Sequence, residues 1–460
     1  MSTMLNRDFD RLIVDRVDEG RFSVHRDALR DPEIFELEMR YIFEGTWIFL
    51  GLASQAPDPH DYFTAWIGRQ PVVVSRDAHG VLHAFLNTCR HRGALVCQHA
   101  RGNAKYHVCA YHGWSYNSAG RNIDIKDRKD GCYSAAFEAE DHDLVRVPRF
   151  EEYRGLLFGC IDPDVHSLDE HLGETRFFID LVIDQSPEGM ELVPGSATYT
   201  YKANWKLQVE NGLDAYHLTS THPSFMKIVE RRHSGESKNK LAALDFSLYK
   251  LRGGFTFDYG HAAVWSRNPK PEIRPLYPSI EALRKRVGDL RAEWMLNSRN
   301  LVLFPNIQFA ENASLQLRTI RPLSVNLTEM KSWCLAPVGE SAAAREFRLR
   351  QFEDFFNPSG LATPDDTTCY EDCQTGNGAR IVDWQQGYSR GMTSVQAHSN
   401  EIAQSLGFNP ATSQHGAHEI QDETVFHSAY REWLRLMKAG AARDATRDAA
   451  RDATLGGGAT

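Results

Sequence analysis

The spacing of apolar residues along the chain predicts short strands and helices in alternation. Between residues 30 and 48, apolar residues recur with a roughly helical spacing that ends at Trp47. From residue 47 to about 160, short β-rich runs are separated by Gly, Asp and Asn, which predicts a compact antiparallel domain. The runs are Trp47–Leu50, Tyr62–Ile67, Pro71–Ser75 and Val81–Leu86, with Phe150–Ile161 as the last strand.

The region from residue 165 to about 438 mixes both periodicities. Thr198–Tyr201 and Ser314–Ile320 alternate as strands do, whereas Ile280–Met295 and Ala343–Phe356 have the spacing of helices. The expected fold class is therefore α+β, with a β-rich domain followed by a domain in which helices flank an antiparallel sheet.

Four segments are expected along the chain. Residues 1–44 form a helical segment that packs on the second domain, 45–164 form the β-rich domain, and 165–438 form the second domain. Residues 439–460 repeat Arg-Asp-Ala and end in a Gly-rich stretch with little to bury. They are predicted to be a disordered tail.

Composition excludes several classes of function. The 460 residues carry a net charge of -9 with both signs interspersed, and no basic stripe indicates a nucleic-acid partner. The first residues lack the apolar core of a signal peptide, and no run of about 18 apolar residues predicts a membrane span. A cytoplasmic location is expected, so the eight cysteines are interpreted as thiols or metal ligands.

The first chemical constellation pairs thiols with imidazoles. Cys89-Arg90-His91 and Cys109-Ala110-Tyr111-His112 each follow a predicted strand, so two loop tips could bind one metal centre between them. Structural zinc sites usually place two or more residues between paired ligands, so a Cys-x-His pair is too tight for an ordinary zinc finger. In a two-iron cluster, two thiolates can hold one iron and two imidazoles the other, which suits a one-residue gap.

These residues, followed by Gly113-Trp114 and Tyr116-Asn117, resemble the Rieske domain of aromatic-ring-hydroxylating oxygenases. The resemblance implies a 2Fe–2S cluster held by Cys89, His91, Cys109 and His112. Rieske proteins of respiratory complexes carry a further disulfide between the loops. Ala94 and Tyr111 stand at the corresponding positions here, so that bridge cannot form.

The second constellation contains Asp214, His217 and His222. Asp214 and His217 are three residues apart and would share a helix face. His222 could converge with them only if the helix ends near Thr219, which Pro223 favours. Two histidines with one carboxylate form the facial arrangement of non-haem iron(II) oxygenases.

The same oxygenase family shows this pattern, and the resemblance implies the remaining roles. His217 and His222 would bind a mononuclear Fe(II), and the third ligand would be Asp366, in preference to Asp365. Asp214 would link the iron of one subunit to the cluster of its neighbour, with His112 and His217 as its partners.

The implied reaction is cis-dihydroxylation of an aromatic ring with O2. Electrons would come from a separate NAD(P)H-dependent reductase, with or without a ferredoxin, because the chain has no dinucleotide or flavin motif. By resemblance, the chain is a large (alpha) subunit that assembles as a trimer, often with three small beta subunits.

The similarity covers residues 25 to 438 and is greatest to benzoate-type dioxygenases, which include toluate, anthranilate and 2-halobenzoate enzymes. The residues that carry it are Asp184–Gly189, Tyr199–Tyr201, Asn204–Lys206, Glu210–Gly212, Ser298–Leu301 and Phe352–Asn357. The stretch after His217 departs from the benzoate pattern, which favours an ortho-substituted benzoate that would yield catechol. Lys227, Arg231 and Arg232 are candidates to bind the substrate carboxylate.

Three other interpretations are weighed beside this one. A salicylate-type ring monohydroxylase would use the same two metal centres. A zinc-binding interaction module would use only the first constellation. An electron carrier that holds only the cluster would give no function to the motif of Asp214, His217 and His222.

Overall fold

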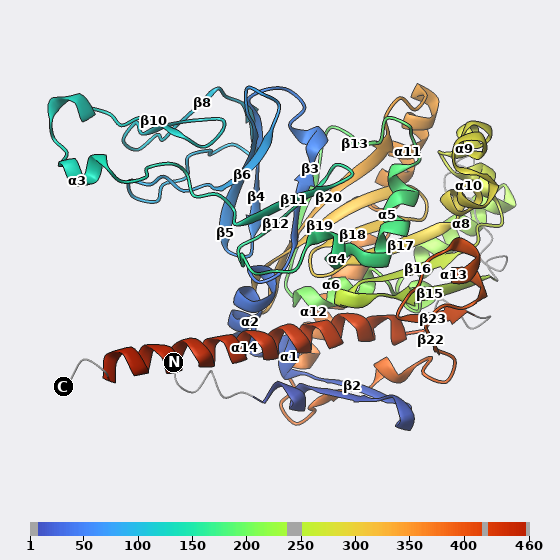
Figure 1. The fold of residues 1–460 in the computed structure, drawn as a ribbon. Coiled ribbons are helices and arrows are strands. Elements are labelled where there is room, and N and C mark those ends of the chain that lie inside the picture. Colours follow the sequence, from blue (N-terminus) through green and yellow to red (C-terminus); the bar gives the residue numbers. More distant parts are fainter. Residues whose placement is uncertain (1–7, 237–250, 416–421, 457–460) are drawn as a thin grey trace. The chain divides into compact units, whose positions relative to one another are not determined.

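The structure, a computed structural model, describes residues 8–236, 251–415 and 422–456. It divides into a smaller unit, Met39–Glu170, and a larger unit that joins Met1–Glu38 to His171–Thr460 (Figure 1). The smaller unit extends beyond the expected range 45–164 at both ends. The N-terminal segment accordingly leaves the larger unit at Glu38, before the expected boundary at residue 44.

The smaller unit is built from antiparallel sheets in the orders β6-β5-β4-β7, β10-β9-β8 and β11-β12-β3. The strands are β3 (Ile48–Leu52), β4 (Asp61–Ile67), β5 (Gln70–Arg76), β6 (Leu82–Leu86), β7 (Arg101–Asn103), β8 (Tyr106–Val108), β9 (Ser115–Asn117), β10 (Asn122–Asp124), β11 (Arg149–Tyr153) and β12 (Leu156–Cys160), and a short helix, α3 (Ala135–Glu138), follows β10. The single strand expected over Phe150–Ile161 is a hairpin, because Arg154 and Gly155 adopt positive φ and reverse the chain.

The larger unit contains an antiparallel sheet of ten strands among the described residues, in the order β13-β20-β19-β18-β17-β16-β15-β23-β22, with β14 also paired to β20. The strands are β13 (Met190–Leu192), β14 (Ala197–Tyr201), β15 (Arg252–Thr256), β16 (Ala262–Ser266), β17 (Ser298–Leu303), β18 (Ile307–Glu311), β19 (Leu315–Ser324), β20 (Leu327–Pro337), β22 (Gln396–Ala397) and β23 (Thr412–His415). The sheet and its helices confirm the α+β class.

The helices that accompany this sheet are α1 (Asp27–Arg30), α2 (Pro32–Glu38), α5 (Arg176–Ile183), α6 (Trp205–Asn211), α7 (Leu218–Thr221), α8 (Pro223–Ser234), α9 (Ile280–Val287), α10 (Asp289–Leu296), α11 (Ala342–Phe355), α12 (Thr363–Asn377), α13 (Glu401–Leu406) and α14 (His427–Gly456), while α4 (Leu168–Leu172) spans the boundary between the units. The helix expected over Ile280–Met295 is two helices, because Gly288 has φ of 84° and interrupts the hydrogen-bonded ladder.

The N-terminal segment is only partly helical, which differs from the expectation. A hairpin of β1 (Ile13–Arg16) and β2 (Arg21–His25) precedes α1, and β2 also pairs with β21 (Trp384–Gln385). Gly20, with φ of 63°, ends the short turn between the two strands. An isolated two-stranded hairpin is only marginally stable, and this one gains stability from its pairing with β21. The local spacing of apolar residues therefore predicted the helix but not the hairpin.

The prediction of a disordered tail over 439–460 is wrong for the described part of that segment. Helix α14 continues to Gly456 and appears as the long red helix in Figure 1. Its beginning is anchored by buried Trp433 and Met437. The following residues are rich in Ala and Arg, two of the strongest helix formers, so the helix propagates without apolar burial.

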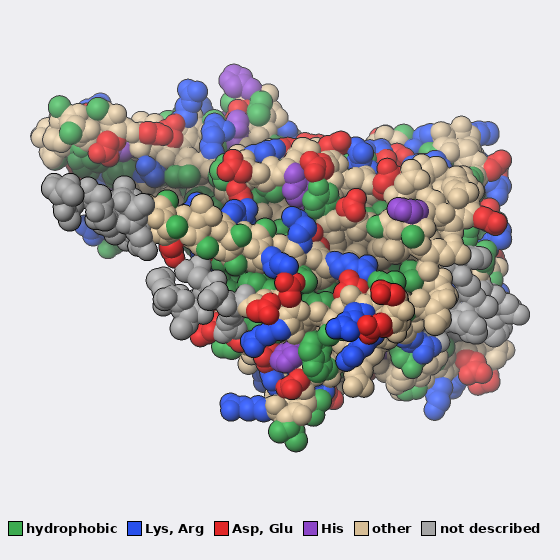
Figure 2. All heavy atoms as spheres, turned by 60° about the horizontal axis from the view of Figure 1, so that its bottom comes forward, with side chains coloured by type: hydrophobic (Ala, Val, Ile, Leu, Met, Phe, Trp, Pro, Cys, Tyr) green, Lys and Arg blue, Asp and Glu red, His purple; other side chains and the backbone are tan. Residues whose placement is uncertain are grey.

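Acidic and basic side chains are interspersed on the molecular face drawn in Figure 2, as the sequence indicates. Within the described residues, no helix combines the length and apolarity needed to cross a bilayer.

A buried ion pair joins α2 to α6 within the larger unit. The Lys206 ammonium contacts the Glu38 carboxylate and donates to the Ala28 carbonyl at 2.7 Å. Glu38 also accepts from the indole N–H groups of Trp205 and Trp433, at 2.8 and 2.7 Å. Because both charged side chains are almost fully buried, each is the counter-ion that compensates the charge of the other.

We expect Lys206→Met to lower the free energy of unfolding by about 3–5 kcal/mol, because Glu38 would stay buried without its cation. Urea unfolding followed by tryptophan fluorescence measures this change. The double variant Lys206→Met with Glu38→Gln should be more stable than Lys206→Met alone. Equal stability of the two variants would show that the pair does not control the packing here.

Candidate metal centres

Two loops of the smaller unit share one backbone turn. Cys89 follows β6 and Cys109 follows β8, and each cysteine carbonyl accepts a hydrogen bond of 2.9 Å from the glycine N–H four residues later. These glycines, Gly93 and Gly113, have φ of 74° and 76°, a region that L side chains rarely adopt. The local sequence thus folds both loops alike and turns their Cys and His side chains toward one another.

The four side chains fit a 2Fe–2S cluster. Cys89 and Cys109 are buried neighbours, and the rings of His91 and His112 lie 4.3 Å apart between centroids. The Nδ1 atoms of both histidines are buried and have no hydrogen-bond partner among the described residues. Two buried sulfurs and two buried imidazole nitrogens without partners are the ligand set that a Rieske cluster requires.

Two aromatic residues that we did not assign from the sequence support this site. The Tyr116 hydroxyl lies 3.4 Å from the Cys89 sulfur and accepts a hydrogen bond from the Arg90 N–H. The Trp114 ring stacks on His91 at 5.3 Å. Hydrogen bonds to cluster sulfurs tune the reduction potential, so Tyr116 is placed to adjust it. The sequence feature that could have identified both residues is the run Gly-Trp-Ser-Tyr at positions 113–116.

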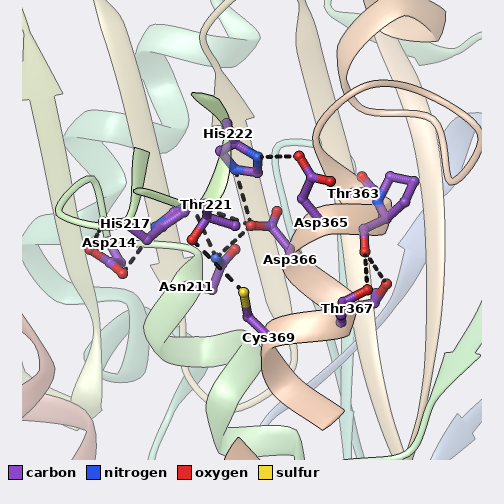
Figure 3. A network of polar contacts seen from close by, with 12 residues as sticks. Asn211, Asp214, His217, Thr221, His222, Thr363, Asp365, Asp366, Thr367 and Cys369 are labelled. Atoms are coloured by element: carbon purple, nitrogen blue, oxygen red, sulfur yellow. Dashed lines mark hydrogen bonds and ion pairs between the residues drawn. The ribbon is translucent and has the colours of Figure 1, made fainter. Parts of the chain in front are cut away.

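The second centre brings together His217, His222 and Asp366 in the larger unit (Figure 3). One potential ligand atom from each lies within 4.8 Å of the others. The Asp366 Oδ1 atom is 3.3 Å from His217 Nε2 and 3.2 Å from His222 Nε2. Two imidazoles and one carboxylate that converge in this way fit a mononuclear non-haem iron.

The helix that was expected to carry Asp214 and His217 ends before both of them. Helix α6 stops at Asn211, and Asp214 lies in the turn that follows, so it does not share a helix face with His217. At Gly212, a Cβ atom would lie 2.2 Å from the Gln308 side chain of β18. A larger residue at position 212 would displace the Gln308 amide, which donates a hydrogen bond to the Gln208 carbonyl.

His222 lies between two helices rather than at the end of one. Helix α7 ends at Thr221 instead of Thr219, and Pro223 is the first residue of α8. This break turns His222 toward Asp366, which lies in the first turn of α12. The break explains how a histidine five residues beyond His217 reaches the same point.

Carboxylates also hold the outer nitrogen of each imidazole. Asp214 Oδ2 lies 3.0 Å from His217 Nδ1, and Asp365 Oδ2 lies 3.2 Å from His222 Nδ1 (Figure 3). Asn211 donates to Asp366 at 3.2 Å. Such contacts leave each Nε2 lone pair for a metal and fix the ring orientation. Sequence reasoning considered Asp365 only as a ligand and missed its contact with His222.

The charges of the three residues are strongly coupled. Burial lowers the pKa of His217, but its contacts with Asp214 and Asp366 outweigh burial and raise it to about 10. Burial would raise the pKa of Asp366, but His217 and His222 hold it well below the usual range for aspartate. His217 therefore carries a proton near neutral pH, and a metal at Nε2 must displace it.

Iron(II) affinity is expected to rise with pH, because His217 is protonated below its pKa of about 10 and binding releases that proton. We expect about a tenfold increase per pH unit between roughly pH 6.5 and 8.5. Anaerobic titration of iron-stripped enzyme against a competing chelator tests this. An affinity that stays constant across the range, after correction for the chelator, would contradict the predicted charge state.

The triad opens onto a cavity of about 170 Å³. Its apolar walls include Phe225, Trp265, Phe355 and Phe356. An apolar protein cavity of about 150 Å³ accommodates one benzene ring, so this cavity matches a substrate with a single ring.

None of the three cations suggested from the sequence is among the residues that line this cavity. Lys227 is exposed, and Arg231 is exposed near Glu236. Arg232 is buried but forms two hydrogen bonds with Asp354, at 2.7 and 2.9 Å. The hypothesis that one of them binds a substrate carboxylate finds no support in the structure.

Family models match both parts of the chain: the Rieske 2Fe–2S domain over residues 46–145 and the ring hydroxylating alpha subunit (catalytic domain) over residues 190–435. The chain belongs to the ring-hydroxylating alpha subunit family. It is a Rieske-type dioxygenase whose cofactors are a 2Fe–2S cluster and a mononuclear non-haem iron. The zinc-binding module and the cluster-only electron carrier are therefore wrong.

Named relatives cover nearly the whole chain. Toluate 1,2-dioxygenase subunit alpha from Pseudomonas putida is 40% identical over 97% of this chain and 98% of its own length. The 2-halobenzoate 1,2-dioxygenase large subunit from Burkholderia cepacia is 39% identical over 92% and 90%. A naphthalene 1,2-dioxygenase structure with indole in its active site has a TM-score of 0.78, with 27% identity and 94% coverage of each chain.

Proposed function

We propose that this ring-hydroxylating dioxygenase adds both atoms of O2 to carbons 1 and 2 of a single-ring aromatic carboxylate. The observation that carries the proposal is the opening of the His217, His222 and Asp366 triad onto a cavity of about 170 Å³ with aromatic walls. The names of the toluate and 2-halobenzoate relatives support the substrate class, since both substrates are benzoates.

The residue roles in this proposal follow from the contacts. His217, His222 and Asp366 would hold the iron, while Asp214 and Asp365 orient the two imidazoles. Bound iron supplies O2 activation. The apolar walls position the ring and exclude bulk water, so that reducing equivalents are used on the substrate.

The cluster ligands would be Cys89, His91, Cys109 and His112. Electrons would reach them from a separate NAD(P)H-dependent reductase, directly or through a ferredoxin. The side chain of Asp214 is 23% exposed, which leaves room for a second contact beyond His217. In an alpha-subunit trimer, with or without three beta subunits, that contact would be His112 of a neighbouring copy.

With an ortho-substituted benzoate, the diol would lose its substituent. A 2-halobenzoate, O2, two electrons and two protons would give a diol that expels halide and CO2 and leaves catechol. The atoms and charges balance in this sequence, and no further oxidant is needed.

Turnover by the enzyme reconstituted with reductase, NADH and O2 tests the proposal. Benzoate, 2-chlorobenzoate, anthranilate and salicylate would be compared with naphthalene by coupled O2 uptake. We expect turnover with the first three carboxylates, with catechol and chloride formed from 2-chlorobenzoate. Turnover of naphthalene alone, or of no carboxylate by enzyme with both iron centres intact, would refute the substrate class.

A further inference from the structure

Three buried arginines line the substrate cavity: Arg274, Arg299 and Arg318. Two of them contact one carboxylate. Glu311 lies 3.1 Å from Arg274, contacts Arg299, and also accepts a hydrogen bond of 3.0 Å from Gln185. Arg274 and Arg299 therefore each have an ion-pair partner, the shared carboxylate of Glu311.

Arg318 has different surroundings. It lies in the middle of β19, directly opposite Gln308 of β18, and its Nε donates to the Gln308 side chain at 2.7 Å. The Tyr199 hydroxyl lies beside its guanidinium. Arg318 is 6% exposed, and no carboxylate of the described residues forms an ion pair with it. The two side chains that contact Arg318, those of Gln308 and Tyr199, are both uncharged.

A buried guanidinium without a carboxylate is costly unless another anion neutralises it. Asp366 acts on the same tyrosine, Tyr199, from the iron side of the cavity, but iron(II) would more than compensate that carboxylate's charge. Arg318 therefore brings to the cavity wall a positive charge that forms no ion pair with a carboxylate of the described residues. An anionic substrate would complete the charge balance.

We propose that Arg318 binds the carboxylate of the aromatic substrate and thereby directs carbons 1 and 2 of the ring toward the iron triad. The planar guanidinium has N–H groups beyond the one used by Gln308, and it can bind both carboxylate oxygens at once. This assignment rests on the proposed function, since it names the residue that selects carboxylates at the same site.

The test compares Arg318→Gln and Arg318→Lys with wild-type holoenzyme. Dissociation constants for labelled benzoate and for neutral benzamide are measured by anaerobic equilibrium dialysis, alongside KM and kcat. Arg318→Gln should weaken benzoate binding about 100-fold and change benzamide binding less than threefold. Arg318→Lys should keep part of the affinity, because the charge remains but the paired geometry is lost.

A matched control is Arg321→Gln on the same strand. Arg321 pairs with Glu329 at 3.2 Å and is not among the cavity-lining residues, so benzoate binding should not change. Cluster absorbance and iron content identify variants that have lost their fold, and Arg318→Lys keeps the test available if Arg318→Gln is one of them.

The outcomes separate this assignment from the proposed function. If wild-type enzyme neither binds nor oxidises benzoates, the proposed substrate class is wrong. If wild-type enzyme uses benzoates and both Arg318 variants bind benzoate as tightly as it does, the proposed function stands and the Arg318 assignment is wrong. Equal weakening of benzoate and benzamide would also overturn it, because it would indicate a general loss of cavity shape.

Discussion

Replacing His222 with alanine is expected to abolish substrate oxidation while the Rieske cluster stays intact. His222 is buried, its Nε2 lies 3.2 Å from Asp366, and no other imidazole among the described residues joins it and His217 at the triad. Losing one of the three proposed protein ligands should remove the mononuclear iron and reduce turnover by at least about 1000-fold. Metal analysis, the EPR signal of the cluster and product formation measure the three quantities separately.

His233→Ala is the control for this variant. His233 is an exposed histidine in α8, where it contacts Lys270, and its loss should leave iron content and turnover unchanged. If His222→Ala retained full mononuclear iron and near-normal turnover, the triad would not be the iron site. Loss of both iron centres together would instead indicate a folding defect, which cluster absorbance would reveal.

Replacing Asp214 with asparagine should reduce product formation by about 100-fold or more without loss of either iron centre. The substitution preserves size but removes the charge that lies 3.0 Å from His217 Nδ1. Partners of metal-bound histidines typically contribute 10- to 100-fold to activity, and the proposed link to His112 of a neighbouring subunit would add to this. The direct readout is slow reoxidation of the reduced cluster when substrate and O2 are present.

Asp365→Asn provides the matched comparison for Asp214→Asn. Asp365 holds the other imidazole at 3.2 Å, and its side chain is 41% exposed, so its loss should cost about tenfold or less. Cluster reoxidation in this variant should remain close to the wild-type rate. If both variants slowed reoxidation equally, Asp214 would only orient His217, and the proposed electron route through it would be wrong.

The sequence was sufficient for the local motifs because their chemistry lies in short spacings. Cys89 with His91 and Cys109 with His112 are two compact loops, and the structure places all four side chains together. For the iron site, the α+β pattern could not reveal how residues 217, 222 and 366 approach each other. The resemblance to a known family supplied that information.

The remaining features depend on tertiary contacts that no local pattern contains. Gly212, directly after the end of α6, lies close to the side chain of Gln308, which comes almost a hundred residues later. Arg318 could not be distinguished from other strand arginines until the pairing of β18 with β19 showed its neutral partners. The C-terminal part of α14 was not predicted for a different reason. The segment has few apolar residues to bury, but its Ala and Arg residues have a high intrinsic helix propensity.

The fate of oxygen in a single turnover tests dioxygenation most directly. Reconstituted enzyme would convert 2-chlorobenzoate under 18O2, and mass spectrometry would determine the label in catechol. Dioxygenation predicts that both catechol oxygens carry the label and that chloride and CO2 are released in equal amounts. A product with one labelled oxygen would contradict dioxygenation and indicate a ring monohydroxylase that uses the same two metal centres.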